Sequence, residues 1–279
     1  MSCKIVADSS ANMFCLEGVP FASVPLKIIT SQAEYVDVPE LNVEAMVNEV
    51  KETKGKSSTS CPNVHDYLQA FGEADQVYAV TITSNLSGSC AAAMQAKEQY
   101  EQAHPDRRVC VVDSLSAGPE LRLIVEKLKE LIQEGKPFQK IQEVIRAYQS
   151  HTHLLFSLQS LTNLARNGRV SPMVAKVAGV LGIRVVGAAS QTGTLQPLHK
   201  CRGEKKALDT ILTEMKERRF RGGKVRIAHC FNLESARQLK DIILTHFPGS
   251  DIQIEPCAAL CSFYAERGGL MVGFADANA

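Results

Sequence analysis

The chain has 279 residues, of which 31 are basic and 30 acidic, so its formal net charge is +1. A charge so close to zero excludes the classes of protein that bind nucleic acid or an anionic membrane through a large basic face. The length exceeds that of one ordinary domain, and an apolar content of 45% is enough for two sizeable cores. We therefore expect two packed domains with a cleft between them.

Nine cysteines are scattered along the sequence. An odd, scattered set is typical of reduced thiols in a cytoplasmic protein. The sequence has no Cys-x-x-Cys pair, and His151 and His153 lie far from Cys257 and Cys261, so we expect no metal site. No signal region begins the sequence and no run approaches about 18 apolar residues, so we expect a cytoplasmic protein without membrane insertion.

The chain begins with short strands and polar turns. We predict a strand over Lys4 to Ala7, which ends in Asp8-Ser9-Ser10-Ala11-Asn12. Phe21 to Ile29 predicts a second strand, which Pro25 should place at a sheet edge or a bulge. Residues 31–42 are polar and contain proline, so a loop is expected there.

A polar run, Lys56-Ser57-Ser58-Thr59-Ser60-Cys61-Pro62-Asn63, precedes an amphipathic stretch that begins at Val64. Proline is favoured in the first turn of a helix, which predicts a helix beginning at Pro62. Thr59 and Ser60 would then line the N-terminus of that helix.

The central stretch joins a strand to an Ala-rich helix. Val77 to Ile82 is rich in β-branched residues, and five small polar or flexible residues follow it, namely Ser84, Asn85, Ser87, Gly88 and Ser89. Such a turn presents hydroxyls and free N–H groups at a helix N-terminus, where an anion is favoured. The alternative is that Ser87 or Ser89 only caps the helix.

Three strands end alike, in Asp8-Ser9-Ser10, Thr83-Ser84 and Asp113-Ser114. Carboxyl ends of parallel strands share one edge of a sheet, where open α/β folds bind ligands. The alternative is that these residues serve only as turns and helix caps. The pattern predicts a mainly parallel sheet flanked by helices.

Two amphipathic helices, 119–134 and 138–150, complete the first half, so we predict an N-terminal α/β domain over 1–150 and a C-terminal α/β domain with a mixed sheet over 151–279. The second half is expected to contain strands at 153–157, 183–189, 194–200, 225–230, 252–255 and 270–274, helices at 158–166, 172–181, 202–219 and 233–247, and a loop at 257–269.

The usual catalytic signatures are missing from the sequence, including Gly-x-Ser-x-Gly, Gly-x-Gly-x-x-Gly and His-Glu-x-x-His. A triad of Ser87 with His199 or His229 and an aspartate has no support in the spacing. Arg202 follows a predicted hairpin that returns toward the cleft, and its guanidinium suits a carboxylate or a phosphate. The alternative is a solvated arginine in a first helical turn.

Six blocks of sequence, taken in order, resemble the DegV family and cover nearly the whole chain. They are Asp8-Ser9-Ser10-Ala11, Thr59-Ser60-Cys61-Pro62, Ile82 to Ser89, Asp113 to Ala117, Leu161 to Val170 and Lys200 to Leu208. The resemblance implies two α/β domains with a long-chain fatty acid between them. Its members are bacterial cytoplasmic lipid binders, and some present the fatty acid to a separate fatty acid kinase that makes acyl phosphate.

The resemblance also implies roles for individual residues. Thr59 or Ser60 and Ser87, with the Gly88 amide, would hold the carboxylate, while Arg202 would lie beside the headgroup. Ser84 lies at the same strand end as Ser87, and its place there leads us to expect that it too binds the ligand. The tail, such as that of palmitate, would thread among apolar residues that otherwise form ordinary core, namely Leu158, Leu161, Val174, Val177 and Leu181.

One departure from the family pattern concerns the headgroup. A block similar to Thr-His-x-Gly-Pro-Gly is common near the C-terminus, and here the corresponding run places Tyr264 where the histidine stands. A phenol can donate a hydrogen bond to a carboxylate, but it is neutral at pH 7 and supplies no cation. Lipid binding therefore tolerates the change better than a kinase partnership does. Cys61 also stands where glutamine is common.

The sequence as a whole predicts a lipid-binding protein without catalysis or a cofactor, whose ligand is a long-chain fatty acid and whose partner could be a fatty acid kinase. Two alternatives stay open. One is a hydrolase or other enzyme acting on a small acyl or anionic substrate in the interdomain cleft, and the other is a binder for a different small anion.

Overall fold

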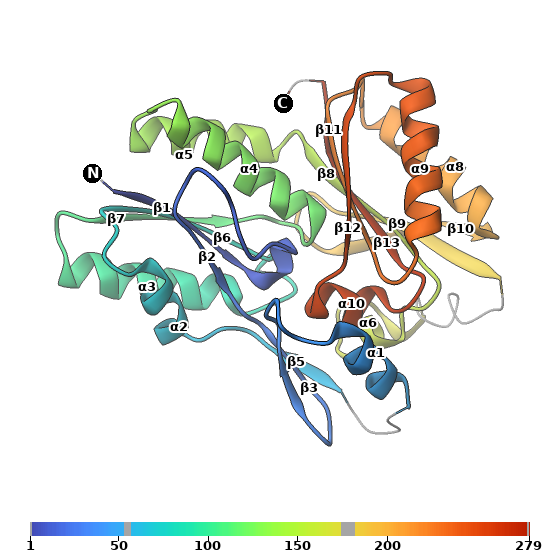
Figure 1. The fold of residues 1–279 in the computed structure, drawn as a ribbon, viewed down its shortest axis with the longest axis horizontal. Helices are drawn as coiled ribbons and strands as arrows, with labels where there is room; N and C mark the ends of the chain where they lie inside the picture. Colours follow the sequence, from blue (N-terminus) through green and yellow to red (C-terminus); the bar gives the residue numbers. More distant parts are fainter. Residues whose placement is uncertain (1, 53–56, 174–181, 278) are drawn as a thin grey trace.

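The computed structural model describes residues 2–52, 57–173, 182–277 and 279. Two α/β halves lie side by side, with the N-terminal half in blue and green and most of the C-terminal half in yellow to red (Figure 1). The strands of the first half are β1 (Cys3–Asp8), β2 (Phe21–Val24), β3 (Lys27–Ile29), β4 (Glu34–Val36), β5 (Ser58–Ser60), β6 (Gln76–Thr81) and β7 (Arg108–Asp113). Its helices are the 3-10 turn η1 (Ser9–Ala11), α1 (Val43–Glu52), α2 (Val64–Phe71), α3 (Ser89–Ala103), α4 (Pro119–Gln133) and α5 (Phe138–Gln149).

The main sheet of the first half has the strand order β2-β1-β6-β7, and every pairing in it is parallel. Alternate residues of β1 enter different cores: Ile5 packs with α4 and α5, whereas Val6 packs with α2 and α3. Strands buried on both faces favour the continuous apolar runs seen in the sequence. The prediction of a mainly parallel sheet flanked by helices is therefore confirmed.

One predicted strand is divided between two sheets. The sequence indicated a single strand over Phe21 to Ile29, which is wrong, because β2 pairs with β1 and β3 joins a small antiparallel sheet of order β4-β3-β5. Pro25 lies at the break, and proline has no N–H to donate to a sheet. The predicted loop over residues 31–42 is likewise wrong where β4 forms.

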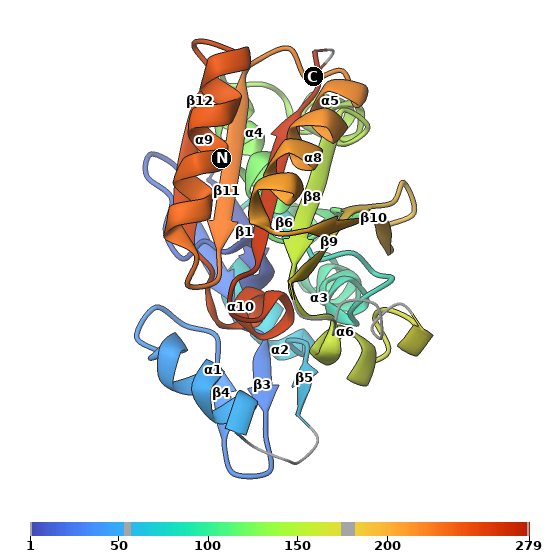
Figure 2. The same ribbon diagram turned by 90° about the vertical axis from the view of Figure 1, so that its right-hand side faces the viewer.

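The second half is built on a mixed sheet of order β10-β9-β8-β13-β11-β12, in which only β11 and β12 pair in parallel. Its elements are β8 (Thr152–Leu158), α6 (Thr162–Arg166), β9 (Ile183–Ala189), β10 (Leu195–Arg202), α8 (Glu204–Glu217), β11 (Lys224–His229), α9 (Leu233–His246), β12 (Asp251–Pro256), α10 (Ala259–Ala265) and β13 (Leu270–Ala275). Helices α8 and α9 lie together on one face of this sheet (Figure 2). The mixed α/β character predicted for this half is confirmed.

Two expected elements of the second half differ from the structure. Residues 257–269 were expected to form a loop, but they contain the buried helix α10. The helix expected over 158–166 is shorter, because β8 continues to Leu158 and α6 begins only at Thr162. The helix expected over 172–181 falls mostly on residues 174–181, which lie outside the described residues.

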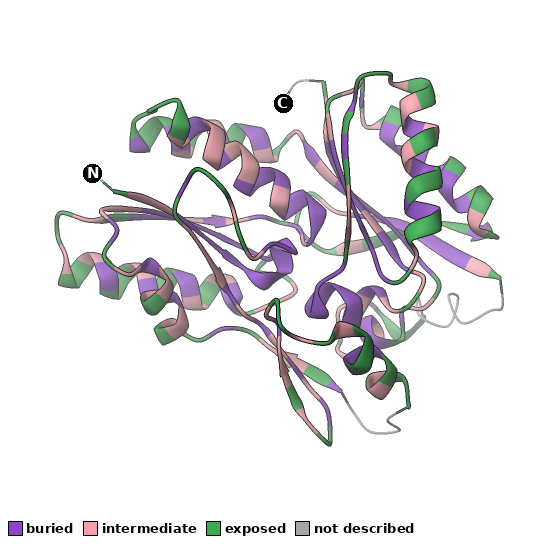
Figure 3. Ribbon diagram, viewed as in Figure 1, coloured by how far each residue is buried: buried purple, intermediate pink, exposed green. Residues whose placement is uncertain are grey.

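Helix α4 joins the two halves. A Cβ on Gly273 of β13 would lie 2.5 Å from the backbone nitrogen of Glu120, so only glycine lets the sheet approach this helix so closely. Further along α4, Glu126 accepts hydrogen bonds from Arg226 of β11 at 2.8 Å and from Arg122 at 2.9 Å. Glu120 and Gly273 are both buried, whereas Arg122 and Glu126 are partly exposed, and α4 accordingly carries both purple and pink in Figure 3. We propose that the domain boundary lies at residues 150 and 151, between α5 and β8.

Candidate functional site

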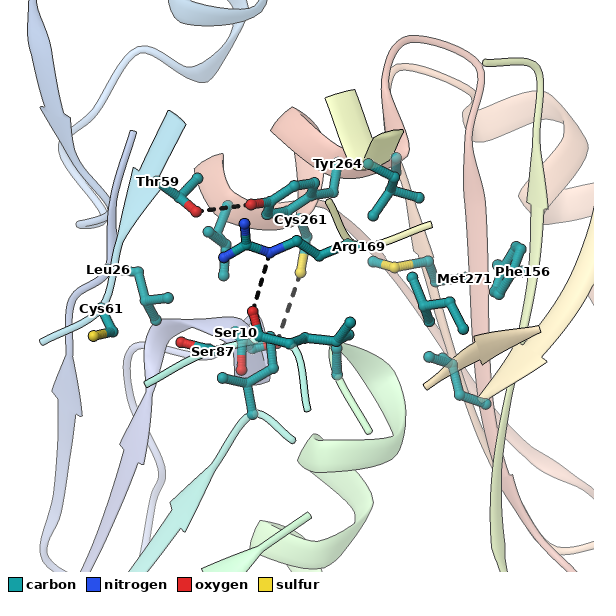
Figure 4. Close-up of a pocket in the computed structure, with 18 of the residues that line it drawn as sticks. Ser10, Leu26, Thr59, Cys61, Ser87, Phe156, Arg169, Cys261, Tyr264 and Met271 are labelled. Atoms are coloured by element: carbon teal, nitrogen blue, oxygen red, sulfur yellow. Dashed lines mark hydrogen bonds between the residues drawn. The ribbon is translucent and has the colours of Figure 1, made fainter. Parts of the chain in front are cut away.

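A cavity of about 260 Å³ lies where the two halves meet. One end is polar, and the remaining wall is almost entirely apolar. Figure 4 shows Thr59 and Ser87 at one end and Met271 and Phe156 at the other. The described lining residues are Ser10, Leu26, Thr59, Ser60, Cys61, Ile82, Leu86, Ser87, Gly88, Ala117, Leu154, Phe156, Leu158, Leu164, Arg169, Leu195, Leu260, Cys261, Tyr264, Ala265 and Met271.

The polar end is organised by Asp8 at the end of β1. Its carboxylate accepts hydrogen bonds from the Ile82 amide at 2.8 Å, the Ser89 hydroxyl at 2.6 Å and the Ser10 amide at 3.2 Å. Complete burial raises the pKa of Asp8, and the hydrogen bonds offset part of that rise. Because β1, β6 and β7 are adjacent and parallel, the three similar strand ends do share one sheet edge. Through these bonds Asp8 connects the ends of β1 and β6 to the start of α3.

Thr59 and Ser60 line the cavity from β5 rather than from a helix N-terminus. The prediction that Pro62 begins a helix is wrong, because α2 begins at Val64 with Asn63 as its N-cap. Asn63 forms a capping box with Asp66, which fixes the helix start without Pro62. The hydroxyls of Thr59 and Ser60 are therefore presented by antiparallel pairing with β3.

Ser87 and Gly88 line the cavity at the N-terminus of α3, as the sequence predicted. Gly88 is the N-cap residue, and the Ser87 hydroxyl accepts a hydrogen bond from the Ser89 amide at 3.3 Å. Ser89 itself is buried between Asp8 and Tyr67, to which its hydroxyl lies at 2.6 Å and 2.7 Å. Neither serine therefore caps the helix as the alternative interpretation supposed, because the N-cap is Gly88 and no side-chain cap bond forms there.

Tyr264, on the buried helix α10, contributes a hydroxyl from the second half. It lies 2.7 Å from the Thr59 hydroxyl. Burial raises the pKa of Tyr264, which the bond to Thr59 and the charge of Arg169 lower only in part. The phenol is therefore a neutral donor at physiological pH, as the sequence predicted.

Arg169 is a lining residue to which the sequence reasoning gave no role. Its Nε donates to the carbonyl oxygen of Leu86 at 3.1 Å (Figure 4), and its Nη1 donates to the carbonyl of Asn167. These bonds fix a cation beside the polar end, between the loop that follows β6 and the loop that follows α6. Arg169 belongs to the block from Leu161 to Val170 that resembles the family, but nothing in the sequence indicates this contact.

Two of the predicted site residues are placed elsewhere. Ser84 is exposed, and its amide donates to the Asp113 carboxylate at 3.1 Å. Arg202 is exposed at the end of β10, directly before the N-cap of α8. Neither belongs to the described residues that line the cavity. Thr59, Ser60, Ser87, Gly88 and Tyr264 do line it together.

Part of the apolar wall comes from the large sheet. Leu154, Phe156 and Leu158 alternate along β8, so their side chains share one face and enter the cavity. Of the predicted tail contacts, Leu158 lines the cavity and Leu161 is buried in the adjoining core. Val174, Val177 and Leu181 lie outside the described residues.

The described residues of this site form no Ser-His-Asp arrangement. His199 pairs with Glu214 at 2.5 Å, and the Nδ1 of His229 accepts from the Asn232 amide at 3.3 Å. Burial lowers the pKa of His229, so this ring is neutral. Among the described residues that line the cavity there is no histidine.

Two features are absent from the described part of the chain. No cluster of three or more His, Cys, Asp or Glu side chains in that part could hold a metal ion. Within the same residues, every helix is too short or too polar to span a membrane.

A family model described as an uncharacterised protein of the DegV family matches residues 2–276. The chain belongs to the DegV family. A DegV domain-containing protein of Streptococcus pneumoniae strain R6 is 43% identical, over 98% of this chain and 99% of the relative.

Solved structures of other DegV proteins are similar over the full length. A DegV family protein from Eubacterium eligens, loaded with heptadecanoic acid, has a TM-score of 0.97 and 41% identity, and the match covers 99% of this chain and 100% of that one. The Streptococcus pneumoniae Fatty Acid Kinase (Fak) B3 protein, loaded with linoleic acid, has a TM-score of 0.96 and 43% identity, with 99% of each chain covered. The resemblance to the DegV family and the two-part α/β fold predicted from it are thus confirmed.

Proposed function

We propose that this protein binds one long-chain fatty acid, with its carboxylate at the polar end of the cavity and its acyl chain along the apolar wall. The observation that carries the proposal is the cavity itself, which has hydrogen-bond donors at one end and almost only apolar side chains elsewhere. Two DegV proteins more than 40% identical to this chain are loaded with fatty acids.

The donors at the polar end suit a carboxylate. The hydroxyls of Thr59, Ser60, Ser87 and Tyr264 and the N-terminus of α3 can each donate to its oxygens. Arg169 supplies the positive charge that the phenol cannot, so the change from histidine to Tyr264 leaves a cation at this end. A carboxylate held in this way remains ionised.

The apolar wall supplies the affinity. Each buried methylene contributes about 0.8 kcal/mol, so a sixteen-carbon tail contributes on the order of 10 kcal/mol before ordering costs. The donors of the polar end then determine the direction in which the chain enters, because a buried carboxylate without partners is strongly unfavourable.

The same proposal assigns the protein a partner protein and a cellular location. We infer that it presents the bound acid to a fatty acid kinase, because the Fak B3 protein is similar over its whole length. Cys61 is exposed beside Ser60 and Ser87, which places the polar end close to the surface, where a partner can reach it.

The protein itself would carry out no catalysis and need no cofactor, and it would act in the cytoplasm. The cavity argues against a hydrolase, since its described lining lacks a general base for Ser87.

The test is direct extraction. The purified protein is denatured and extracted with organic solvent, and the extract is quantified by mass spectrometry. We expect about one long-chain fatty acid per chain. Absence of fatty acid, together with esterase turnover that is abolished in Ser87→Ala, would establish the hydrolase instead. Retention of a different organic anion would establish a binder of another class.

A further inference from the structure

Among the described residues, two neighbouring side chains of the large sheet lie at the end of the cavity away from the polar residues. Phe156 of β8 and Met271 of β13 are paired across the two strands, and both line the cavity. Figure 4 shows them at the side opposite Thr59 and Ser87. We call Phe156 and Met271 the end wall.

A glycine beside Phe156 makes room for its ring. Gly187 of β9 is the partner of Phe156 on the other side of β8. A Cβ at position 187 would overlap the Cζ atom of Phe156 and lie 2.6 Å from its Cε2 atom. The ring therefore extends over β9, into the space that any other side chain at position 187 would occupy.

A second glycine accommodates Met271. A Cβ on Gly118, just before α4, would lie 3.1 Å from the Cε atom and 3.4 Å from the Sδ atom of Met271. The Gly118 amide donates to the carbonyl oxygen of Ser10 at 2.8 Å, which fixes this turn beside the sheet edge. Each side chain of the end wall thus packs against a glycine from a neighbouring element.

We propose that the end wall sets the longest acyl chain that the cavity accepts, and that Gly187 determines the position of its rigid member, Phe156. This inference rests on the proposed function, since it specifies which fatty acids the same site selects. A phenyl ring has few rotamers and resists displacement, whereas the unbranched methionine adapts to its neighbours. Phe156 therefore sets a fixed limit on the length of the acyl chain, and the flexible side chain of Met271 lets that length vary slightly.

Two substitutions should change the length of the longest accepted acyl chain in opposite directions. Phe156→Leu shortens the side chain at the end wall, so a longer acyl chain finds room. Gly187→Ala forces the ring away from β9, and the cavity is the open space on that face of the sheet, so the accepted chain becomes shorter. Each added methylene that is buried should raise relative retention about fourfold.

The experiment offers the purified, delipidated protein an equimolar mixture of saturated fatty acids that differ by two carbons. The retained acids are extracted and quantified by mass spectrometry. For Phe156→Leu we expect the ratio of each longer acid to the next shorter one to rise, at the upper end of the series, by about fourfold for each of the two extra methylenes that the enlarged cavity buries. Phe274→Leu is the matched control, because it changes the same residue type in the same sheet but in the core of the opposite face.

The outcomes separate this inference from the proposed function. If Phe156→Leu folds normally by circular dichroism and retains the wild-type distribution, the end wall does not set the limit. If Phe274→Leu shifts the distribution equally, the effect comes from general loosening and the inference is wrong. A Cβ at Gly187 would also approach the Gln196 carbonyl oxygen at 2.5 Å, so Gly187→Ala could fail to fold. In that case Phe156→Trp, which enlarges the ring, must shift retention toward shorter acids. A wild-type protein that binds no fatty acid would overturn both proposals.

Discussion

The hydroxyls of Thr59 and Tyr264 lie 2.7 Å apart although 205 positions separate them in the sequence. Thr59 belongs to the small sheet of the first half and Tyr264 to α10 of the second, so this bond closes the polar end between the two halves. Because a hydroxyl can donate to only one acceptor at a time, the hydroxyl that donates in this bond would have to turn in order to donate to a bound carboxylate, whereas its partner can donate without turning.

The Tyr264 hydroxyl should contribute to retention of the fatty acid without being essential. Tyr264→Phe removes one neutral donor and leaves the ring packing in place. We expect the dissociation constant for a fatty acid to rise by about 2-fold to 10-fold, measured by competition with a fluorescent fatty acid. Tyr35→Phe is the control, since the Tyr35 hydroxyl bonds to Glu49, and neither residue belongs to the described cavity lining. An equal loss in both variants would contradict a role in headgroup binding.

Arg169 should matter more than Tyr264 because it is the charged donor at this end. Arg169→Ala removes the cation and also its bond to the Leu86 carbonyl. Hydrogen bonds to charged groups are worth more than neutral ones, so we expect the dissociation constant to rise about tenfold or more. Arg169→Lys should restore only part of the lost affinity, because the lysine ammonium lacks the planar, two-pronged donor geometry of a guanidinium. Arg166→Ala, on the neighbouring helix α6, is the control, and wild-type affinity in Arg169→Ala would refute the assignment.

The sequence was sufficient for the parts of the fold that are locally encoded. The β-branched run before Ser84 and the repeated Asp-Ser ends predicted the parallel sheet and its ligand-binding edge. Helix α10 was missed because it has only seven residues and no side-chain cap at its start, so neither its periodicity nor its boundary was visible.

The site was less predictable than the fold because long-range contacts determine it. Thr59 lies in a strand only because β5 pairs with β3, and no local propensity signals this pairing. Arg169 faces the polar end through its bond to Leu86, which is 83 positions away. Arg202 was chosen instead because a hairpin was expected to return it to the cleft, but β10 ends with its side chain exposed.

Arg202 should act in the kinase reaction rather than in holding the lipid. It is exposed and lies outside the described cavity lining, so its guanidinium is available to a partner protein or to a phosphate. In Arg202→Ala we expect acyl phosphate formation by a fatty acid kinase to fall at least about tenfold, while retained fatty acid per chain stays near the wild-type value. Lys200→Ala, an exposed cation on the same strand, is the control. Equal losses of phosphorylation and retention would show that Arg202 acts on lipid binding.

Glu120 should make the stability of the protein depend on pH near neutrality. Its buried carboxyl accepts hydrogen bonds from Thr152 at 2.8 Å and from Ser116, where the first half meets the second. Burial raises the pKa of Glu120 from 4.5 to about 7, and the two hydroxyls offset part of that rise. Between pH 4.5 and about pH 7, Glu120 therefore carries a proton in the folded state but not in the unfolded state.

The sign of the effect follows from this difference in bound protons. The contribution of Glu120 to the free energy of unfolding is fully present below pH 4.5 and is lost as the pH rises through about 7. Glu120→Gln stays neutral, and its amide offers an oxygen that accepts from one hydroxyl and an N–H that donates to the oxygen of the other. Its stability should therefore exceed that of the wild type above pH 7, by on the order of 3 kcal/mol. Urea unfolding at several pH values measures this difference. Glu134→Gln, at an exposed position after α4, should reproduce the wild-type curve, and a Glu120→Gln curve parallel to it at every pH would rule out this titration.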